Sequence, residues 1–153
     1  MAALKDQLRA DLTAAMKARD ELRTRTIRMA LTAVSTAEVA GRTSRELSDD
    51  EVITVLTREA KRRREAADAF AAAGRTEQAS AERAEGEVLD AYLPAQLGDV
   101  EIAAIVTAGI EQTGATGMKA MGQVMKVVTP QTAGRADGGR VAAEVRRQLS
   151  QQA

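Results

Sequence analysis

Few residues in this sequence could carry out chemistry, because two of the most versatile catalytic types are absent. The 153 residues include no cysteine and no histidine. The chain therefore lacks thiolate metal ligands, cysteine nucleophiles, imidazole bases and any Ser-His-Asp arrangement. One phenylalanine, one tyrosine and no tryptophan leave almost no ring that could stack on a base. The composition predicts no catalytic, cofactor or metal site and favours a binding module.

The most unusual charged pair is Glu59 and Arg63, which lie four residues apart within an apolar stripe between Leu56 and Ala67. Charges on such a face should be paired, because an isolated buried charge is very costly. Glu38 lies on an apolar stripe of the preceding helix and could join them. The cluster could be a buried carboxylate site or a polar clamp that fixes helix register. Without histidine, metal ligands or a nucleophile nearby, the clamp is the favoured interpretation.

Two groups of basic residues could contact phosphates. In the first, acidic neighbours dilute the positive charge, which favours a solvated face with salt bridges. The second group follows residue 96 and is the candidate nucleic-acid-binding set. The first group is Lys17, Arg19, Arg23, Arg25, Arg28, Lys61, Arg62 and Arg64, and the second is Lys119, Lys126, Arg135, Arg140, Arg146 and Arg147.

A glycine-rich segment at residues 134–140 leads into an expected helix and includes Arg135 and Arg140. It is not a P-loop, because no Gly-Lys-Ser/Thr follows. A helix N-terminus offers free N–H groups and a favourable dipole to a phosphate. Asp137 could instead cap that helix itself, in which case the glycines serve only the turn. The residue type favours capping by Asp137, while phosphate contact and plain solvation remain open for the two arginines.

The chain should be all-α, because apolar residues recur at spacings of three and four and strict alternation is absent. Asp20 is a candidate N-cap, Ser48–Glu51 a capping box, and Gly41 and Gly74 candidate C′ residues. Both prolines should fall outside the helices, and Gly122, beside Met121 and Met125, suggests close helix approach. The expected helices are 2–18, 20–40, one from the Ser48 box to about 73, 76–92, 99–112, 117–128 and 138–149.

A change in composition near residues 93–98 predicts two domains. Residues 1–93 carry 16 basic and 17 acidic residues, whereas residues 94–153 carry 6 and 5 and hold 8 of the 11 glycines. We expect an N-terminal four-helix domain at 1–95 and a small three-helix domain at 96–153. The N-terminus lacks the apolar stretch of a signal peptide, and no segment is apolar enough to span a membrane. A cytoplasmic protein without membrane contact is therefore expected.

Three stretches, taken together, resemble the GatB/YqeY family. They are AMKARDELRTRTIRMALTAVSTAEV at 15–39, LTREAKRRREAADAFAAAGRTE at 56–77 continuing to VLDAYLPAQL at 88–97, and MGQVMKVVTPQTAGRADGGRVAAEV at 121–145. They cover nearly the whole chain in the family's order. The combination of YLPAQL, MGQVM and GRADG is the most specific part of the resemblance.

The resemblance implies a small C-terminal domain similar to the tail of the B subunit of the glutamine-dependent tRNA amidotransferase. That tail contacts tRNA, and a separate subunit supplies ammonia. The implied role is an accessory tRNA-binding module, with amidotransferase or translation-related proteins as partners and a family label of carbon–nitrogen ligase with glutamine as amido-N-donor. The catalytic portion of that subunit is absent at this length, so we expect no catalysis by the chain alone. The alternative is a helical protein–protein interaction module that binds no RNA.

Overall fold

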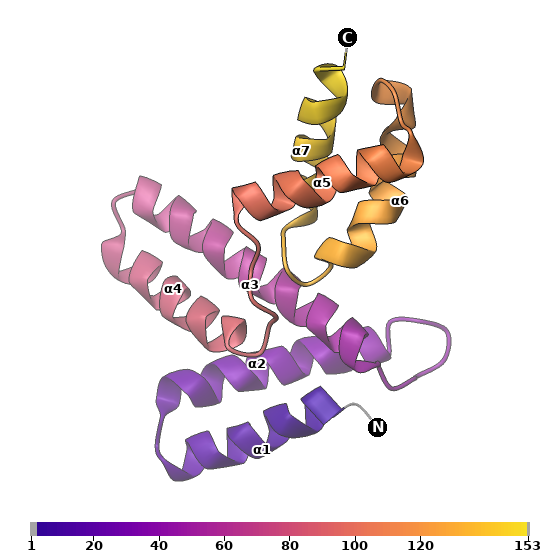
Figure 1. The fold of residues 1–153 in the computed structure, drawn as a ribbon. Coiled ribbons are helices and arrows are strands. Elements are labelled where there is room, and N and C mark those ends of the chain that lie inside the picture. Colours follow the sequence, from indigo (N-terminus) through magenta and orange to yellow (C-terminus); the bar gives the residue numbers. More distant parts are fainter. Residues whose placement is uncertain (1–2, 153) are drawn as a thin grey trace. The chain divides into compact units, whose positions relative to one another are not determined.

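The computed structural model describes residues 3–152 and is helical throughout, with no strand in that range (Figure 1). The predicted all-α class is therefore confirmed. The elements are α1 (Ala3–Lys17), α2 (Glu21–Glu38), α3 (Asp49–Ala72), α4 (Thr76–Asp90), α5 (Asp99–Thr113), the 3-10 turn η1 (Met118–Ala120), α6 (Met121–Thr132) and α7 (Gly138–Ser150).

Residue contacts group the chain into two compact units. Unit 1 is Met1–Leu93 and includes α1 to α4, and unit 2 is Pro94–Ala153 and includes α5 to α7. Each unit has its own cluster of buried apolar side chains. Within residues 3–152, no helix combines the length and the apolar character needed to cross a bilayer.

The core of unit 1 is built from the apolar stripes of its four helices. Leu8 of α1, Ile27 of α2, Leu56 of α3 and Leu89 of α4 are all completely or almost completely buried. Each such side chain contributes about 1.5–3 kcal/mol through removal from water. Small residues are buried on both α3 and α4, which form the most extensive helix pair within residues 3–152. They are Ala60, Ala67, Ala79 and Gly86.

Local capping interactions set several helix ends as the sequence predicts. The Oγ atom of Ser48 accepts a hydrogen bond from Glu51 N at 3.3 Å, and Glu51 Oε2 accepts one from Ser48 N at 2.8 Å. Asp20 Oδ1 accepts a bond from Arg23 N at 3.0 Å, so it caps α2. Gly74 follows α3 with φ of 75°, a left-handed conformation that glycine adopts without strain. These three predictions are confirmed.

The ends of two helices differ from the prediction. Helix α2 stops at Glu38, and Gly41 is not its C′ residue, because the loop turns back so that Arg45 N donates to Glu38 O at 3.0 Å. Helix α6 runs through Pro130, which the sequence placed outside any helix. The proline lies in the last turn, where its missing N–H removes a single hydrogen bond and its fixed φ still suits a helix.

The close approach in unit 2 occurs at a different glycine from the one expected. Gly122 is exposed, and a Cβ atom built on it would meet nothing within 4 Å. A Cβ atom on Gly109 would lie 2.7 Å from Val128 Cγ1, so α5 and α6 touch at this point. The surrounding core is built from the stripes of α5, α6 and α7. It includes Ile102, Val106, Val124, Val128, Val141, Val145 and Leu149.

The capping box should make the stability of unit 1 depend on pH. Arg45 donates to both carboxylate oxygens of Glu51 at 2.6 and 2.9 Å, and with the Ser48 N–H it lowers the pKa of Glu51 from 4.5 to about 2. A carboxyl group with a lowered folded pKa stabilises the fold above its unfolded pKa, and this contribution is lost as pH falls towards 2. We expect Glu51→Gln to flatten the fall in unfolding free energy between pH 5 and 2, measured by urea titration.

The matched control for this measurement is Glu77→Gln, which removes an exposed carboxylate from the first turn of α4. A Glu77→Gln profile that flattens as much as that of Glu51→Gln would contradict a specific role for the capping box.

Candidate functional site

The six basic residues that the sequence marks as a nucleic-acid-binding set are all exposed in unit 2. They come from four local segments rather than one helix face. Lys119 lies on η1, Lys126 on α6, Arg135 in the loop before α7, and the other three on α7. The six residues differ in whether their charge is already paired with a carboxylate of the same chain.

Two of the six are committed to ion pairs. Arg140 Nη2 donates to Asp99 Oδ1 at 2.5 Å, and Arg140 Nη1 donates to Leu97 O at 3.5 Å, so this side chain ties the start of α7 to the start of α5. Arg147 donates to both carboxylate oxygens of Glu144 at 2.6 and 2.9 Å. Hydrogen bonds from Arg147 and from Gln148 lower the pKa of Glu144 from 4.5 to about 2.

The remaining four basic residues have no carboxylate partner among residues 3–152. Lys119, Lys126 and Arg146 make no ion pair there, and Arg135 donates only to the backbone oxygen of Gln131 at 3.4 Å. Their positive charge is therefore available to a ligand. The sequence alone could make only part of this division: Arg147 and Glu144 lie three residues apart on one helix, whereas the pairing of Arg140 with Asp99 joins residues that are 41 positions apart.

The glycine-rich segment before α7 forms a hydrogen-bonded turn, and Asp137 caps the N-terminus of α7. Asp137 Oδ1 accepts a hydrogen bond from Gly139 N at 3.1 Å, which is the capping role the residue type favours. The segment 94–97 packs against this turn, because Leu97 N donates to Arg135 O at 2.7 Å and Gln96 Nε2 donates to Gly134 O at 3.1 Å. Two stretches that are nearly 40 residues apart in sequence thus form one local structure.

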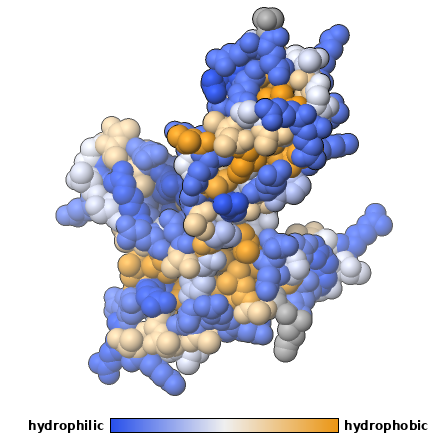
Figure 2. All heavy atoms as spheres, in the orientation of Figure 1, coloured by the Kyte–Doolittle hydropathy of each residue, from blue (hydrophilic) through white to orange (hydrophobic). Residues whose placement is uncertain are grey.

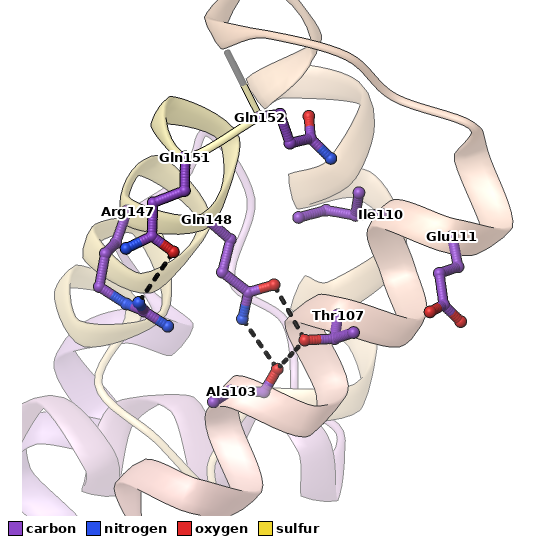
Figure 3. A pocket seen from close by; sticks show the side chains of 8 residues that line it. All are labelled: Ala103, Thr107, Ile110, Glu111, Arg147, Gln148, Gln151 and Gln152. Carbon is purple, nitrogen blue, oxygen red and sulfur yellow. Dashed lines mark hydrogen bonds between the residues drawn. The ribbon is translucent and has the colours of Figure 1, made fainter.

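A hollow of about 440 Å³ with both polar and apolar lining lies along the contact between α5 and α7 (Figure 3). Gln148 crosses it: its Nε2 donates to Ala103 O at 3.0 Å and its Oε1 accepts from Thr107 Oγ1 at 2.9 Å. Arg147, which lines the same hollow, also donates to Gln151 Oε1 at 3.2 Å. The polar groups along this contact mainly bond to one another, and the hollow has no nucleophile paired with a base. Within residues 3–152 no group of acidic side chains is arranged to hold a metal ion.

The charged cluster in unit 1 extends across three helices. Arg63 Nη1 donates to Glu59 Oε2 at 2.9 Å, and Arg63 Nε lies 3.6 Å from Glu85 Oε2. Glu85 Oε1 accepts in turn from Arg25 Nε at 3.1 Å, and Glu59 Oε1 accepts from Arg62 Nη1 at 3.3 Å. The Arg63, Glu59 and Glu85 side chains are only 8%, 14% and 12% exposed. The cluster has the geometry of a clamp between α2, α3 and α4.

Glu38 does not join this cluster in the structure. Its carboxylate bonds instead to the ammonium group of Lys5, and both side chains are largely buried between α1 and α2. Sequence reasoning missed both Lys5 and Glu85. Glu85 could have been found, since it precedes the core residue Leu89 by one helical turn and so lies on the buried side of α4.

Comparison with known families gives one clear result. The family model described as Yqey-like protein matches residues 5–149, which is essentially the whole chain. A search of curated proteins finds no match. The match includes the YLPAQL segment, the glycine-rich turn against which it packs, and the buried Glu59–Arg63 pair. The chain therefore belongs to the family of Yqey-like proteins.

Proposed function

We propose that the protein is an accessory RNA-binding module that contacts the phosphates of tRNA through unit 2. The observation that carries the proposal is the set of exposed basic residues without carboxylate partners: Lys119, Lys126, Arg135 and Arg146. Folded RNA is recognised largely by shape and by phosphate and 2′-hydroxyl contacts, which requires no stacking aromatic residue. The resemblance of the sequence to the tRNA amidotransferase tail points to the same ligand. No catalytic step is assigned to this chain.

A test of RNA binding should replace only basic residues that do not hold the fold together. Arg140 connects α5 to α7, so its removal would disturb the fold as well as any RNA contact. Lys119, Lys126 and Arg146 make no such bonds, and their replacement leaves the ion pairs of unit 2 intact.

We expect the triple variant Lys119→Ala, Lys126→Ala and Arg146→Ala to bind tRNA more weakly than the wild type. Removal of each phosphate contact should also lower the slope of log affinity against log salt by about one. Binding of fluorescently labelled tRNA at about 50–200 mM salt measures both quantities. The slope should therefore fall by about two to three.

The matched control changes the same net charge in unit 1, with Arg42→Ala, Arg58→Ala and Arg75→Ala. These three side chains are exposed and make no ion pair within residues 3–152. Equal loss of affinity in both triple variants would show a nonspecific charge effect. No binding by the wild type at the lowest salt concentration would favour the alternative of a protein–protein interaction module.

Exposed hydrophobic side chains support the alternative of a protein–protein interaction module. Most of the surface in view is hydrophilic, with hydrophobic atoms in smaller areas (Figure 2). The exposed large hydrophobic residues include Val100, which is 83% exposed at the start of α5, and Met118, which is 45% exposed on η1. Both belong to unit 2, whereas Met16, Met29 and Val39 are exposed in unit 1, so exposed apolar side chains that could contact a protein partner are present on both units.

A further inference from the structure

Arg63 is a buried cation whose donors are incompletely satisfied by its neighbours. Its side chain is 8% exposed, and its Nη1 donates to Glu59 Oε2 at 2.9 Å. Its Nε has no hydrogen-bond partner within residues 3–152, since Glu85 Oε2 lies 3.6 Å away. Its Nη2 donates to the sulfur of Met29 at 3.6 Å. Buried polar atoms are normally paired with oxygen or nitrogen acceptors, so this guanidinium group lacks a strong acceptor next to Met29.

Met29 contacts this buried group and is also open to solvent. It lies on α2 and is 40% exposed, so a small dissolved molecule can reach it. Methionine is unbranched and has three rotatable bonds, so its thioether can turn without a shift of the helix. A thioether sulfur is a weak hydrogen-bond acceptor with two lone pairs. Arg63 contacts the sulfur through one donor, and the second lone pair can react.

Oxidation converts such a weak acceptor into a strong one. When a thioether reacts with hydrogen peroxide, a sulfur lone pair attacks one peroxide oxygen, and an S–O bond forms as the O–O bond breaks. The sulfur is oxidised and the peroxide is reduced, since the departing hydroxide takes the proton of the transferred oxygen and leaves as water. The product is methionine sulfoxide, which reductases can convert back to methionine. A hydrogen bond from an ionised donor to its oxygen is about twice as strong as one between neutral groups.

We propose that Met29 is an oxidation site at which the sulfoxide oxygen becomes the missing acceptor of Arg63. Rotation about the bonds next to the sulfur brings the oxygen to Nη2, and the exposed thioether moves outward to make room for it. The new bond joins α2 to α3 at the charged clamp. Oxidation by a hydroperoxide therefore stabilises unit 1, whereas a sulfoxide in an apolar core disrupts packing.

Met16 provides an internal comparison, because it makes the same type of contact at the surface. Arg28 Nη2 lies 3.6 Å from Met16 Sδ, and Met16 is 51% exposed. Arg28 is itself exposed, so its donors can bond to water. A sulfoxide oxygen at Met16 would replace water as the acceptor, and such an exchange changes stability little. The different burial of Arg63 and Arg28 therefore predicts different effects of oxidation at the two methionines.

Two single variants separate these effects, since Met16→Leu keeps Met29 and Met29→Leu keeps Met16. Each full-length protein is treated with hydrogen peroxide, and the sulfoxides are located by mass spectrometry. Urea unfolding of unit 1 is then followed by the fluorescence of Tyr92, the single tyrosine. Oxidation should raise the folding equilibrium constant of Met16→Leu about three- to tenfold and change that of Met29→Leu by less than about twofold. Equal effects in the two variants, destabilisation of Met16→Leu, or failure of peroxide to modify Met29 would overturn the proposal.

Arginine side-chain NMR of the Met16→Leu protein tests the contact itself and leaves Arg63 in place. The Nε–H resonance of Arg63 should move on oxidation, because the same guanidinium group gains a strong acceptor at Nη2. Arg62 is the neighbouring residue on α3, and its side chain is 68% exposed, so its resonance should stay where it is. An unchanged Arg63 resonance after complete oxidation of Met29, or an equal shift at Arg62, would overturn the proposal.

Discussion

Replacing Arg63 with methionine should cost unit 1 about 3 kcal/mol of unfolding free energy. The substitution keeps an unbranched side chain but removes the cation that lies between two largely buried carboxylates, Glu59 and Glu85. Losing one partner of a buried ion pair typically costs about 3–5 kcal/mol, because a charge remains without compensation. Arg25 and Arg62 still contact the two carboxylates from the surface, so we expect the lower end of that range.

Urea unfolding followed by tyrosine fluorescence measures this cost in unit 1 and not in unit 2. Tyr92 is the single tyrosine of a chain without tryptophan, and it lies in unit 1. Burial and a hydrogen bond to Asp11 raise the pKa of its hydroxyl group to about 12, so the phenol stays protonated during the measurement at neutral pH.

Arg62→Met is the matched control for Arg63→Met. Arg62 is the neighbouring residue on α3 and bonds to the same carboxylate, but its side chain is 68% exposed. Exposed ion pairs contribute little, so this variant should change stability by about 0.5 kcal/mol or less. The triple variant Arg63→Met, Glu59→Gln and Glu85→Gln should regain part of the loss, since it leaves no buried charge unpaired and the arginines that lose a partner, Arg25 and Arg62, are exposed. Equal costs for Arg62→Met and Arg63→Met would contradict the clamp.

Gly109→Ala should destabilise unit 2, although alanine is the better helix former. A Cβ atom at this position would lie 2.7 Å from Val128 Cγ1, and Val128 is completely buried. Extra volume in a packed core typically costs about 1–3 kcal/mol, against a gain in helix propensity of about 1 kcal/mol. A β-branched valine has little freedom to move aside. Hydrogen exchange of α5 and α6 amides measures the result, because unit 2 contains no aromatic residue.

Gly122→Ala is the control that isolates the packing cost. Gly122 is also helical, but it is exposed and has open space around its Cβ position. Gly122 lies in the first turn of α6 and Gly109 lies inside α5, so the gain in helix propensity is at most equal at Gly122 and the difference between the variants is a lower limit on the cost of the contact with Val128. We expect Gly122→Ala to stabilise unit 2 by up to about 1 kcal/mol and the two variants to differ by about 1–3 kcal/mol. If both variants stabilise unit 2 equally, the close approach at Gly109 is wrong.

The sequence by itself determined the helical class and several helix ends. Ser48 and Glu51 form their capping box, Asp20 caps α2 and Gly74 ends α3, as the residue types indicate. Such features can be predicted because a cap joins groups within three or four residues, and the chain needs no distant partner to form it. The Glu59–Arg63 pair belongs to the same class, since the two residues lie one helical turn apart.

Only the tertiary structure decided the partners of charges that pair across long distances in the sequence. Glu38 bonds to Lys5 across 33 residues, Glu85 reaches Arg63 and Arg25, and Arg140 reaches Asp99 across 41 residues. Helical spacing identifies the face on which a side chain lies but does not say which helix packs against that face. The close contact at Gly109 also depends on the tertiary structure, because the opposing helix, and not the neighbours in sequence, sets the space around a glycine.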